Sequence, residues 1–421
     1  MKKVLILAHD FPPYNSIGGQ RPYSWYKYFF SHGLYPVVIT RFWNSEVINT
    51  EDFYKASSFN TISTEKTETG TVIRVPINPN LRDRFILKFG YQHSIIRKFL
   101  SFFYMFAELI FKYFDPKSAL FHQADAFLKT NHADIIIATG EPFILFKYAS
   151  ILSKKYNIPW IADYRDCWSN NQNLGKIEKF VYSLFEKRFV KSSKCIVTVS
   201  NGYVNKIKDA SRHPDIRVVY NGYWTELIDE PCNKLKKDYF ELLCTGTIYP
   251  YQNLEMFISG FRNFITNQPD AKISISFIGL EFFPEQVKRL QNLIVGIENY
   301  FATTPRMQLS DSFASMKNAD AFLMLASKKR FQLYAKVFEY IAIKKPVLMV
   351  VDDGNEVSRF LRDVNIGYFT NSEEDVCLHL TNLYNMWLNN ELPMYDYSAE
   401  KFSRQVQAEK YATLINQILT H

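Results

Sequence analysis

The sequence predicts an α/β protein in which two doubly wound parallel sheets form separate domains. Short apolar runs typical of buried parallel strands alternate with segments whose apolar residues recur at helical spacing. The polar stretch 225–237 interrupts this alternation, which restarts at Tyr239. A chain of 421 residues is also too long for one ordinary core. We therefore expect two α/β halves joined by a linker.

Composition places the chain among globular proteins and restricts the class of site. Five cysteines are scattered along it without a C-x-x-C pair, which fits a reducing compartment and argues against a zinc framework. The opening MKKVLILAHDFPP lacks a signal-peptide cleavage site and reads as a first strand. We therefore expect a cytoplasmic protein. A net charge of +8 favours anionic partners in general.

The expected elements follow one another in a regular order. In the first half, strands are expected at 4–8, 36–40, 71–77, 133–142, 158–168, 194–203 and 216–224. In the second half they are expected at 240–247, 272–279, 300–307, 320–327 and 346–351, with helices at 253–265, 284–293, 311–317, 335–343 and 356–362. Helices near 374–388 and 399–419 end the chain. No G-x-G-x-x-G follows the first strand, so the sequence does not support a nicotinamide fingerprint.

The segment 331–347 is the most informative part of the chain. A helix over 335–343 would begin at the carboxyl end of a strand, where free N–H groups and the helix dipole favour an anion. Lys336 and Glu339 share one face of this helix and are suited to a phosphate and a sugar hydroxyl, respectively. A solvated Lys–Glu pair on an ordinary βαβ unit is the alternative interpretation.

Two further groups of residues follow strands in the first half. Gly18 and Gly19 let the backbone approach a ligand closely, or simply form a surface turn. His9 ends the first strand and either points into the same region or caps the strand. The strand 158–168 ends in polar residues, which are Asp163, Arg165 and Asp166. They form either part of an active site or an ion pair that locks a loop.

The stretch 81–114 combines basic residues with many aromatic and aliphatic ones. Its most apolar part, 99–114, is shorter than the roughly 20 residues that a bilayer-spanning helix needs. A basic helix with an apolar face is instead suited to the membrane interface. Packing inside the domain core is the alternative. We expect peripheral association with the inner face of the cytoplasmic membrane.

The segment Lys336-Val-Phe-Glu339-Tyr, followed by the strand Lys345-Pro-Val-Leu, resembles the donor-binding signature of family 4 nucleotide-sugar glycosyltransferases. The resemblance covers nearly the whole chain, including the Pro-Pro…Gly-Gly loop and the Arg-Asp-x-Trp segment. It implies the GT-B fold, with two Rossmann-like domains facing each other across a cleft. The acceptor-side domain would span 1–224, the nucleotide-sugar-binding domain 225–400, and a C-terminal helix, 401–421, would return to the first domain.

The resemblance also implies roles for particular residues. Glu339 corresponds to the residue that holds the ribose of the nucleotide. The expected donor-binding residues are Gly18, Gly19, Gly246, Thr247, Gly279, Thr304, Arg306, Gln332, Tyr334, Lys336, Val337 and Glu339. The expected catalytic residues are Asp166, Arg165 and His9.

The chain departs from the family pattern in two places. Phe331 stands where the family has a Glu that holds the donor sugar, so Gln332 or Tyr334 is expected to serve instead. Thr247 and Gln252 stand where the family often has an Arg and a Lys that hold the diphosphate. The replacements are expected to be Lys336, Lys328 or Arg330.

The implied activity is transfer of a sugar from a UDP- or GDP-sugar to a hydroxyl acceptor, with retention and without a metal ion or other cofactor. The stretch 81–114 suggests a polyprenyl-linked glycan as acceptor, as in assembly of capsule or O-antigen polysaccharide. Two alternatives stay open, namely a sugar-nucleotide 2-epimerase of the same fold and a non-catalytic nucleotide-binding subunit. Nucleic acid is not expected as a partner, because the basic residues are dispersed and form no recognised binding motif.

Overall fold

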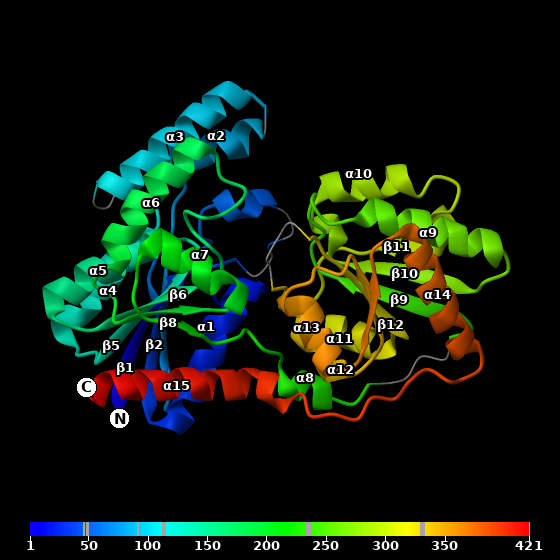
Figure 1. Ribbon diagram of the computed structural model, residues 1–421. Helices are drawn as coiled ribbons and strands as arrows, with labels where there is room; N and C mark the ends of the chain where they lie inside the picture. The colour runs from blue at the N-terminus through cyan, green and yellow to red at the C-terminus, as the bar shows by residue number, and fades with distance from the viewer. Residues whose placement is uncertain are drawn as a thin grey trace. The chain divides into compact units, whose positions relative to one another are not determined.

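The computed structural model describes residues 1–44, 47, 50–90, 92–111, 115–232, 237–328 and 333–420. The chain divides into two compact units. Unit 1 consists of Met1–Asn221 together with Arg404–His421, and unit 2 consists of Gly222–Ser403. Each unit is built around one sheet (Figure 1).

Unit 1 has an eight-stranded sheet in the order β3-β4-β2-β1-β5-β6-β7-β8. Its strands are β1 (Lys2–Leu7), β2 (Leu34–Arg41), β3 (Ser63–Lys66), β4 (Thr71–Val75), β5 (Ile135–Gly140), β6 (Trp160–Tyr164), β7 (Cys195–Thr198) and β8 (Ile216–Val218). All neighbouring pairs are parallel except β3 and β4. The antiparallel edge strand β3 was not expected, because its residues Ser-Thr-Glu-Lys are polar and mostly exposed.

Helices cover both faces of this sheet. They are α1 (Ile17–Tyr28), α2 (Leu81–Phe89), α3 (Ser94–Ile110), α4 (Ser118–Thr130), α5 (Ile144–Tyr156), α6 (Lys176–Val190), α7 (Asn201–Ser211) and α15 (Arg404–Thr420). Leu5 and Leu7 of β1 belong to a core with residues of α3 to α6, while Val4 and Ile6 pack in a second core with α1 and α15. The alternation follows from the two-residue repeat of a strand. In Figure 1, α15 lies alongside α1.

Unit 2 has a six-stranded, wholly parallel sheet in the order β11-β10-β9-β12-β13-β14. Its strands are β9 (Phe240–Thr245), β10 (Ile273–Ile278), β11 (Phe301–Thr303), β12 (Ala321–Leu325), β13 (Val347–Val350) and β14 (Gly367–Thr370). Its helices are α8 (Thr225–Asp229), α9 (Leu254–Asn267), α10 (Pro284–Leu293), α11 (Leu309–Asn318), α12 (Lys336–Ile343), α13 (Glu356–Asp363) and α14 (Glu373–Leu388). Helices α9 and α14 pack on one face, and α12 lies on the other, where Tyr340 stacks on Phe322 with ring centroids 4.1 Å apart.

The strand order places a switch point in each sheet. In unit 1 the chain runs from β1 outward through β2 to one side, and β5 begins the other side. In unit 2 the corresponding pair is β9 and β12. Open α/β sheets bind their ligands beyond the carboxyl ends of the strands at such a point. The prediction of two doubly wound α/β domains with parallel sheets is confirmed.

Some local predictions were wrong in informative ways. The expected loop at 11–21 contains the start of α1, whose N-cap Ser16 accepts a hydrogen bond from the Gly19 N–H at 2.9 Å. The strand expected at 194–203 ends at Thr198, and Ser200 instead caps α7 by accepting from the Gly202 N–H at 3.1 Å. Both cases follow from the preference of Ser for the N-cap position. The linker expected at 225–237 contains the short helix α8.

Candidate functional site

A cluster of polar side chains lies at the switch point of unit 1. His9 and Asp10 follow β1, Glu141 follows β5, and Arg165 and Asp166 follow β6. Because β1, β5 and β6 are neighbours in one parallel sheet, their carboxyl ends meet at one edge. The sheet therefore gathers residues that are about 150 positions apart in the sequence.

Arg165 is the centre of this cluster. Its Nε donates to the Gly140 carbonyl at 2.7 Å, its Nη2 donates to the Glu141 carbonyl, and its Nη1 lies 3.7 Å from Asp10 Oδ2. A Cβ on Gly18 would lie 1.6 Å from Arg165 Nη1. A side chain at position 18 would therefore displace the guanidinium group, which occupies the space beside the first turn of α1. The Gly19 N–H is bonded within the helix cap.

His9 and Asp10 form a pair beside Arg165. His9 Nδ1 lies 2.9 Å from Asp10 Oδ1, and the imidazole ring meets Trp43 edge-on with centroids 5.1 Å apart. Burial lowers the pKa of His9, so the ring is neutral near pH 7. Burial alone would raise the pKa of Asp10, yet the hydrogen bond to His9 and the charge of Arg165 hold it below the usual value. Asp10 is thus a carboxylate that contacts both the Arg165 guanidinium group and the His9 imidazole ring.

The pKa of the Glu141 carboxyl group is strongly perturbed. Part of the side chain is exposed, but the surrounding residues shield the carboxyl group from bulk water. This burial, together with the charge of Asp166, raises the pKa of Glu141 to about 7. A group that changes protonation near pH 7 is suited to acid–base chemistry. Burial also raises the pKa of Asp166, which accepts a hydrogen bond from the Tyr203 hydroxyl at 3.2 Å.

Asp163 has a different role from its neighbours Arg165 and Asp166. It is fully buried in β6 and receives three hydrogen-bond contacts from Arg21, at 2.7–3.1 Å, and one from Thr139 at 2.9 Å. An Arg–Asp pair was one of the two predicted alternatives, but its arginine comes from α1 and not from the same loop. Asp163 therefore stabilises the fold and does not belong to the exposed cluster.

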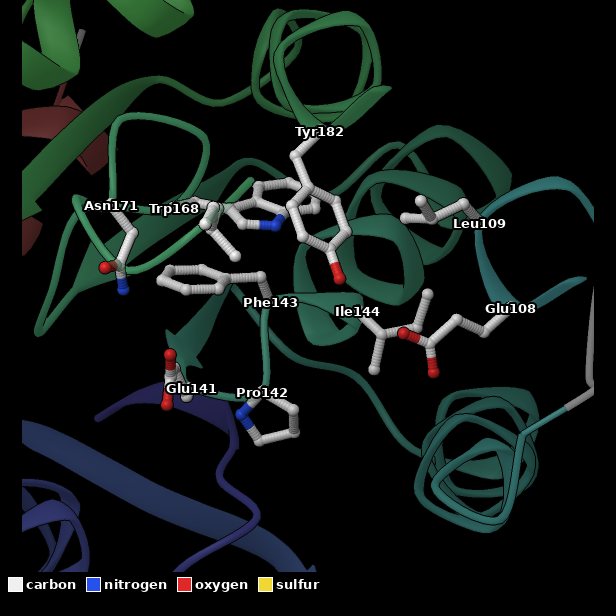
Figure 2. Close-up of a pocket in the computed structure, with 10 residues that line it drawn as sticks. Glu108, Leu109, Glu141, Pro142, Phe143, Ile144, Trp168, Asn171 and Tyr182 are labelled. Atoms are coloured by element: carbon white, nitrogen blue, oxygen red, sulfur yellow. The ribbon is translucent and has the colours of Figure 1, made fainter. Parts of the chain in front are cut away.

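A pocket of about 240 Å³ adjoins Glu141 in unit 1. It is bounded by α3, the connection from β5 to α5, the loop after β6, and α6. Its lining residues are Glu108, Leu109, Glu141, Pro142, Phe143, Ile144, Trp168, Asn171, Leu174 and Tyr182 (Figure 2). The pocket and the polar cluster share Glu141, so a ligand in the pocket would lie beside the cluster.

In unit 2, α12 begins at the switch point. Lys336 is the first residue of α12, and its Nζ donates to the Thr245 carbonyl at the end of β9 at 2.8 Å. The Tyr340 hydroxyl accepts from the Thr245 N–H at 3.1 Å. These two bonds hold the first turn of α12 against the end of β9. Glu339 is half-buried in the same turn. Val337 is fully buried, and its N–H donates to the Tyr334 carbonyl at 3.1 Å.

Glycines end two strands of unit 2. Gly246 follows β9 with φ of +76°, and Gly279 follows β10 with φ of +81°. Both lie in the left-handed region that favours glycine. A Cβ at either position would meet nothing within 4 Å, so conformation, and not space, explains these glycines. Thr247 comes next after Gly246 and is half-buried.

The remaining predicted donor residues are Thr304 and Arg306, which follow β11, and Tyr334 and Gln332, which precede α12 in the sequence. The carbonyl and hydroxyl of Thr304 accept from the Gly279 N–H at 3.1 and 3.3 Å, and the Arg306 guanidinium lies over the Phe282 ring at 3.9 Å. Tyr334 is buried just before α12. Gln332, Phe331 and Arg330 lie outside the described residues.

Gln252 stands at one of the two positions where the resembled family often has an Arg or a Lys that holds the diphosphate. It is buried, and its Nε2 donates to the Leu325 carbonyl at the end of β12 at 2.6 Å. It therefore joins the two strands of the switch point. Among the described residues, no three His, Cys, Asp or Glu side chains are arranged to bind a metal ion.

Asp10, Glu141 and Tyr203 were not identified from the sequence. Asp10 and Glu141 come directly after strands, which is the same signal that identified Arg165 and Asp166. What the sequence does not contain is the strand order that makes β1 and β5 neighbours. Across the described residues, no helix has both the length and the hydropathy to cross a membrane.

The chain was compared with known proteins. It matches no protein-family model, and no curated protein sequence matches it either. It is similar in structure to sucrose-phosphate synthase from Thermosynechococcus elongatus (TM-score 0.68, 11% identity, 100% of both chains covered). It is also similar to Anabaena HepE in complex with UDP and glucose (0.62, 12%, 99% of this chain and 100% of that one). A third similar structure is a glycosyltransferase from Rickettsia africae (0.61, 14%, 99% and 98%).

These likenesses extend over whole chains at low sequence identity, so they establish the fold. The two parallel-sheet α/β units are those of the GT-B fold. Membership of family 4 stays a prediction.

Proposed function

We propose that the protein is a glycosyltransferase that moves a sugar from a nucleotide-sugar donor to a hydroxyl group of an acceptor. The observation that carries this proposal is the placement of α12. Its first turn, with Lys336 and Glu339, is bonded to the end of β9 at the switch point of unit 2. The fold likeness to HepE, which binds UDP and glucose, supports the same assignment.

The donor site would lie around the first turn of α12. The positive end of the α12 dipole and the charge of the Lys336 ammonium group favour a diphosphate. Glu339 can accept hydrogen bonds from the ribose hydroxyls. The turns at Gly246 and Gly279 bring the backbone to the same edge of the sheet. We propose a UDP- or GDP-sugar, with no metal ion required.

The chemistry would rest on stabilising the leaving group. The bond between the sugar and the diphosphate breaks as the bond to the acceptor oxygen forms, and negative charge develops on the departing phosphate. Cationic and N–H donors already in place stabilise that charge. In the retaining reaction that we propose, the leaving phosphate takes the acceptor proton, so the cluster of Arg165, Asp166 and His9 would position the acceptor.

A lipid-linked acceptor at a membrane surface is the second part of the proposal. Helix α3 buries only Met105, Ala107 and Leu109, while much of its apolar surface stays exposed. Its exposed apolar residues, with Phe111 directly after it, are Ile95, Ile96, Phe99, Phe102, Phe103, Ile110 and Phe111. Ile177, Phe180 and Leu184 of α6 are exposed too. Such apolar helices with basic neighbours bind anionic bilayers without spanning them.

The experiment that tests the donor site is a thermal-shift screen against nucleoside diphosphates and their sugars. A ligand that binds only the native state stabilises it by about 2.7 kcal/mol at 100 times its Kd. Glu339→Ala should weaken the binding by roughly 1–3 kcal/mol, the cost of losing a charged hydrogen-bond partner. Glu374→Ala, in the first turn of α14, is the matched control and should not change it. Equal affinity in both variants would overturn the role of Glu339.

Turnover separates the proposal from its two alternatives. A glycosyltransferase consumes the donor in an acceptor-dependent reaction. A 2-epimerase converts the donor alone, and a binding subunit retains affinity without any conversion. Product analysis by mass spectrometry and NMR, with a mixed panel of glycan acceptors, distinguishes these results.

A further inference from the structure

The pocket beside Glu141 has polar groups on two sides and apolar walls between them. Figure 2 shows the Glu108 carboxylate and the Tyr182 hydroxyl on one side of it, and Glu141 and Asn171 on the other. The walls between are apolar and include Phe143 and Trp168. An occupant therefore needs hydrogen-bonding groups at both ends and C–H surface in the middle.

The size of the pocket limits the occupant further. Its volume of about 240 Å³ is slightly below the roughly 300–1,000 Å³ typical of small-molecule sites. One six-membered ring is compatible with this space, whereas a nucleotide or an extended lipid chain is too large to be enclosed.

The charges of the residues that line the pocket disfavour a sugar ring that carries a phosphate. Among the described residues that line it, none is Lys or Arg, and two are glutamates. Burial raises the pKa of Glu108 as well as that of Glu141. A phosphate on the ring would meet these carboxyl groups and gain no ion pair. Hydroxyl groups can instead donate to the carboxylates and accept from Tyr182 and Asn171.

The walls are held in place by bonds outside the pocket. Lys147 Nζ donates to the carbonyls of Glu108 and Phe111 at 2.7 and 2.6 Å, which fixes the end of α3. Trp168 stacks on Phe143 with ring centroids 5.2 Å apart. The next residue, Ser169, donates its N–H to the buried Glu186 carboxylate at 3.0 Å. The pocket is therefore preorganised and needs no ligand to form it.

We infer that this pocket binds an uncharged, hydroxyl-bearing sugar ring of the acceptor and discriminates against a ring that carries a phosphate. The inference rests on the proposed function and specifies its acceptor. The ring would lie beside Glu141 and the Arg165 cluster, so that one of its hydroxyl groups reaches the polar edge of the sheet.

The test is ligand-observed NMR with the full chain, with and without UDP or GDP. The probes are methyl glycosides of glucose, galactose and N-acetylglucosamine, set against glucose 6-phosphate, galactose 6-phosphate and glucosamine. At least one neutral glycoside should bind, and the phosphates should bind at least tenfold more weakly. Glu108→Gln and Tyr182→Phe should each weaken the binding by about tenfold, the change expected for one lost hydrogen bond. Glu68→Gln, an exposed change in the β3–β4 turn, is the control and should leave it unchanged.

A charge-adding variant gives the opposite readout. Asn171→Lys places a cation in a half-buried lining position and should increase binding of the sugar phosphates. Preferential binding of phosphates or glucosamine by the unmodified chain, no binding of any sugar, or indifference to all three pocket variants would overturn the inference. Nucleotide binding that depends on Glu339 would still stand in each case. Conversely, absence of any nucleotide binding would overturn the proposed function whatever the pocket does.

Discussion

At the scale of single residues, burial and partners decide what a carboxyl group does. Asp163 and Glu141 lie near the ends of adjacent strands. Asp163 is fully buried and bonded to Arg21, so its charge is neutralised inside the fold. Protein atoms surround the Glu141 carboxyl group, and this burial, together with the charge of Asp166, raises its pKa to about 7. Both are acidic residues near strand ends, but Asp163 stabilises the fold, whereas Glu141 is suited to acid–base chemistry.

Removing the partner of Asp163 should destabilise the protein strongly. Arg21→Met leaves a buried carboxylate without its cation, and breaking a buried pair in this way costs about 3–5 kcal/mol. Urea unfolding measures this loss. Arg217→Met, which breaks the exposed pair with Asp215, is the control and should cost less than about 1 kcal/mol. Similar small losses in both variants would show that the Arg21–Asp163 pair does not stabilise the native state.

The raised pKa of Glu141 predicts how Glu141→Gln changes stability with pH. Below the ordinary value of 4.5 both the folded and unfolded states hold the proton, so the group has no effect on relative stability. As pH rises from there to about 7, the unfolded state ionises first and the native state loses relative stability. The unsubstituted protein should therefore fall in stability relative to the variant over this range and level off above it.

Unfolding free energies of the two proteins, measured from about pH 5 to about pH 8, test this prediction. Glu374→Gln is the control, because the pKa of Glu374 is lowered by hydrogen bonds at a helix start. It should not show the same decline. A constant difference between the protein and Glu141→Gln across the range would mean that Glu141 titrates normally.

At the scale of elements, α12 was predicted closely from the sequence and α3 was not. The helix expected at 335–343 begins one residue later in the structure, since its buried residues recur at helical spacing. The stretch 81–114 mixes basic and apolar residues, and its described part forms two helices, α2 and α3, separated at Gly90 and His93. Helix α3 packs on the core through Met105 and Leu109 and also has an exposed apolar face.

Polar substitutions on α3 should weaken binding to anionic vesicles. Phe99 and Phe103 are 69% and 49% exposed, so their replacement leaves the core intact. Burying one Phe side chain contributes about 1.5–3 kcal/mol, so Phe99→Ser with Phe103→Ser should lower the partition coefficient at least about tenfold. Vesicle co-sedimentation measures it, and added salt should lower it further. Met394→Ser, at a 98% exposed position in unit 2, should have no effect. Equal sedimentation of all three proteins would refute membrane binding through α3.

At the scale of the whole molecule, the segment 402–411 contributes residues to the cores of both units. Phe402 packs with Phe338 and Phe360 of unit 2, with ring centroids 5.3 and 5.2 Å apart. Nine positions later, Tyr411 packs against Trp25 of unit 1 at 4.8 Å. Unit 1 is therefore completed only when the last helix, α15, has been added to it.

This division predicts unit-specific destabilisation. Truncating a large buried aromatic residue costs about 3–5 kcal/mol. Tyr411→Ala should therefore increase hydrogen exchange in the strands of unit 1, and Phe402→Ala should increase it in those of unit 2. Hydrogen exchange with mass spectrometry resolves the two units, and each variant is the control for the other. Equal exchange of both units in both variants would mean that they unfold as one cooperative body.

Much of the fold follows from local patterns in the sequence. Apolar runs in β1, β5 and β12, and helical spacing in α12, are set by neighbouring residues and could be identified directly. Arg165 and Asp166 were predicted because they follow a strand, and Lys336 because it lies in a segment with helical spacing that resembles a donor-binding signature. Helix starts at Ser16 and Ser200 were missed, since Ser favours turns and N-caps alike.

By itself the sequence determined the fold class and the strand-end positions where polar residues gather, because these depend on periodicity over a few residues. Tertiary structure alone decided which strand ends are neighbours. Pairing of β1 with β5 places Asp10 near Glu141. Contact between α1 and β6 allows Arg21 to bond to Asp163, which is 142 positions away in the sequence. These contacts depend on the strand order of the sheet and on long-range packing, which leave no local pattern in the sequence.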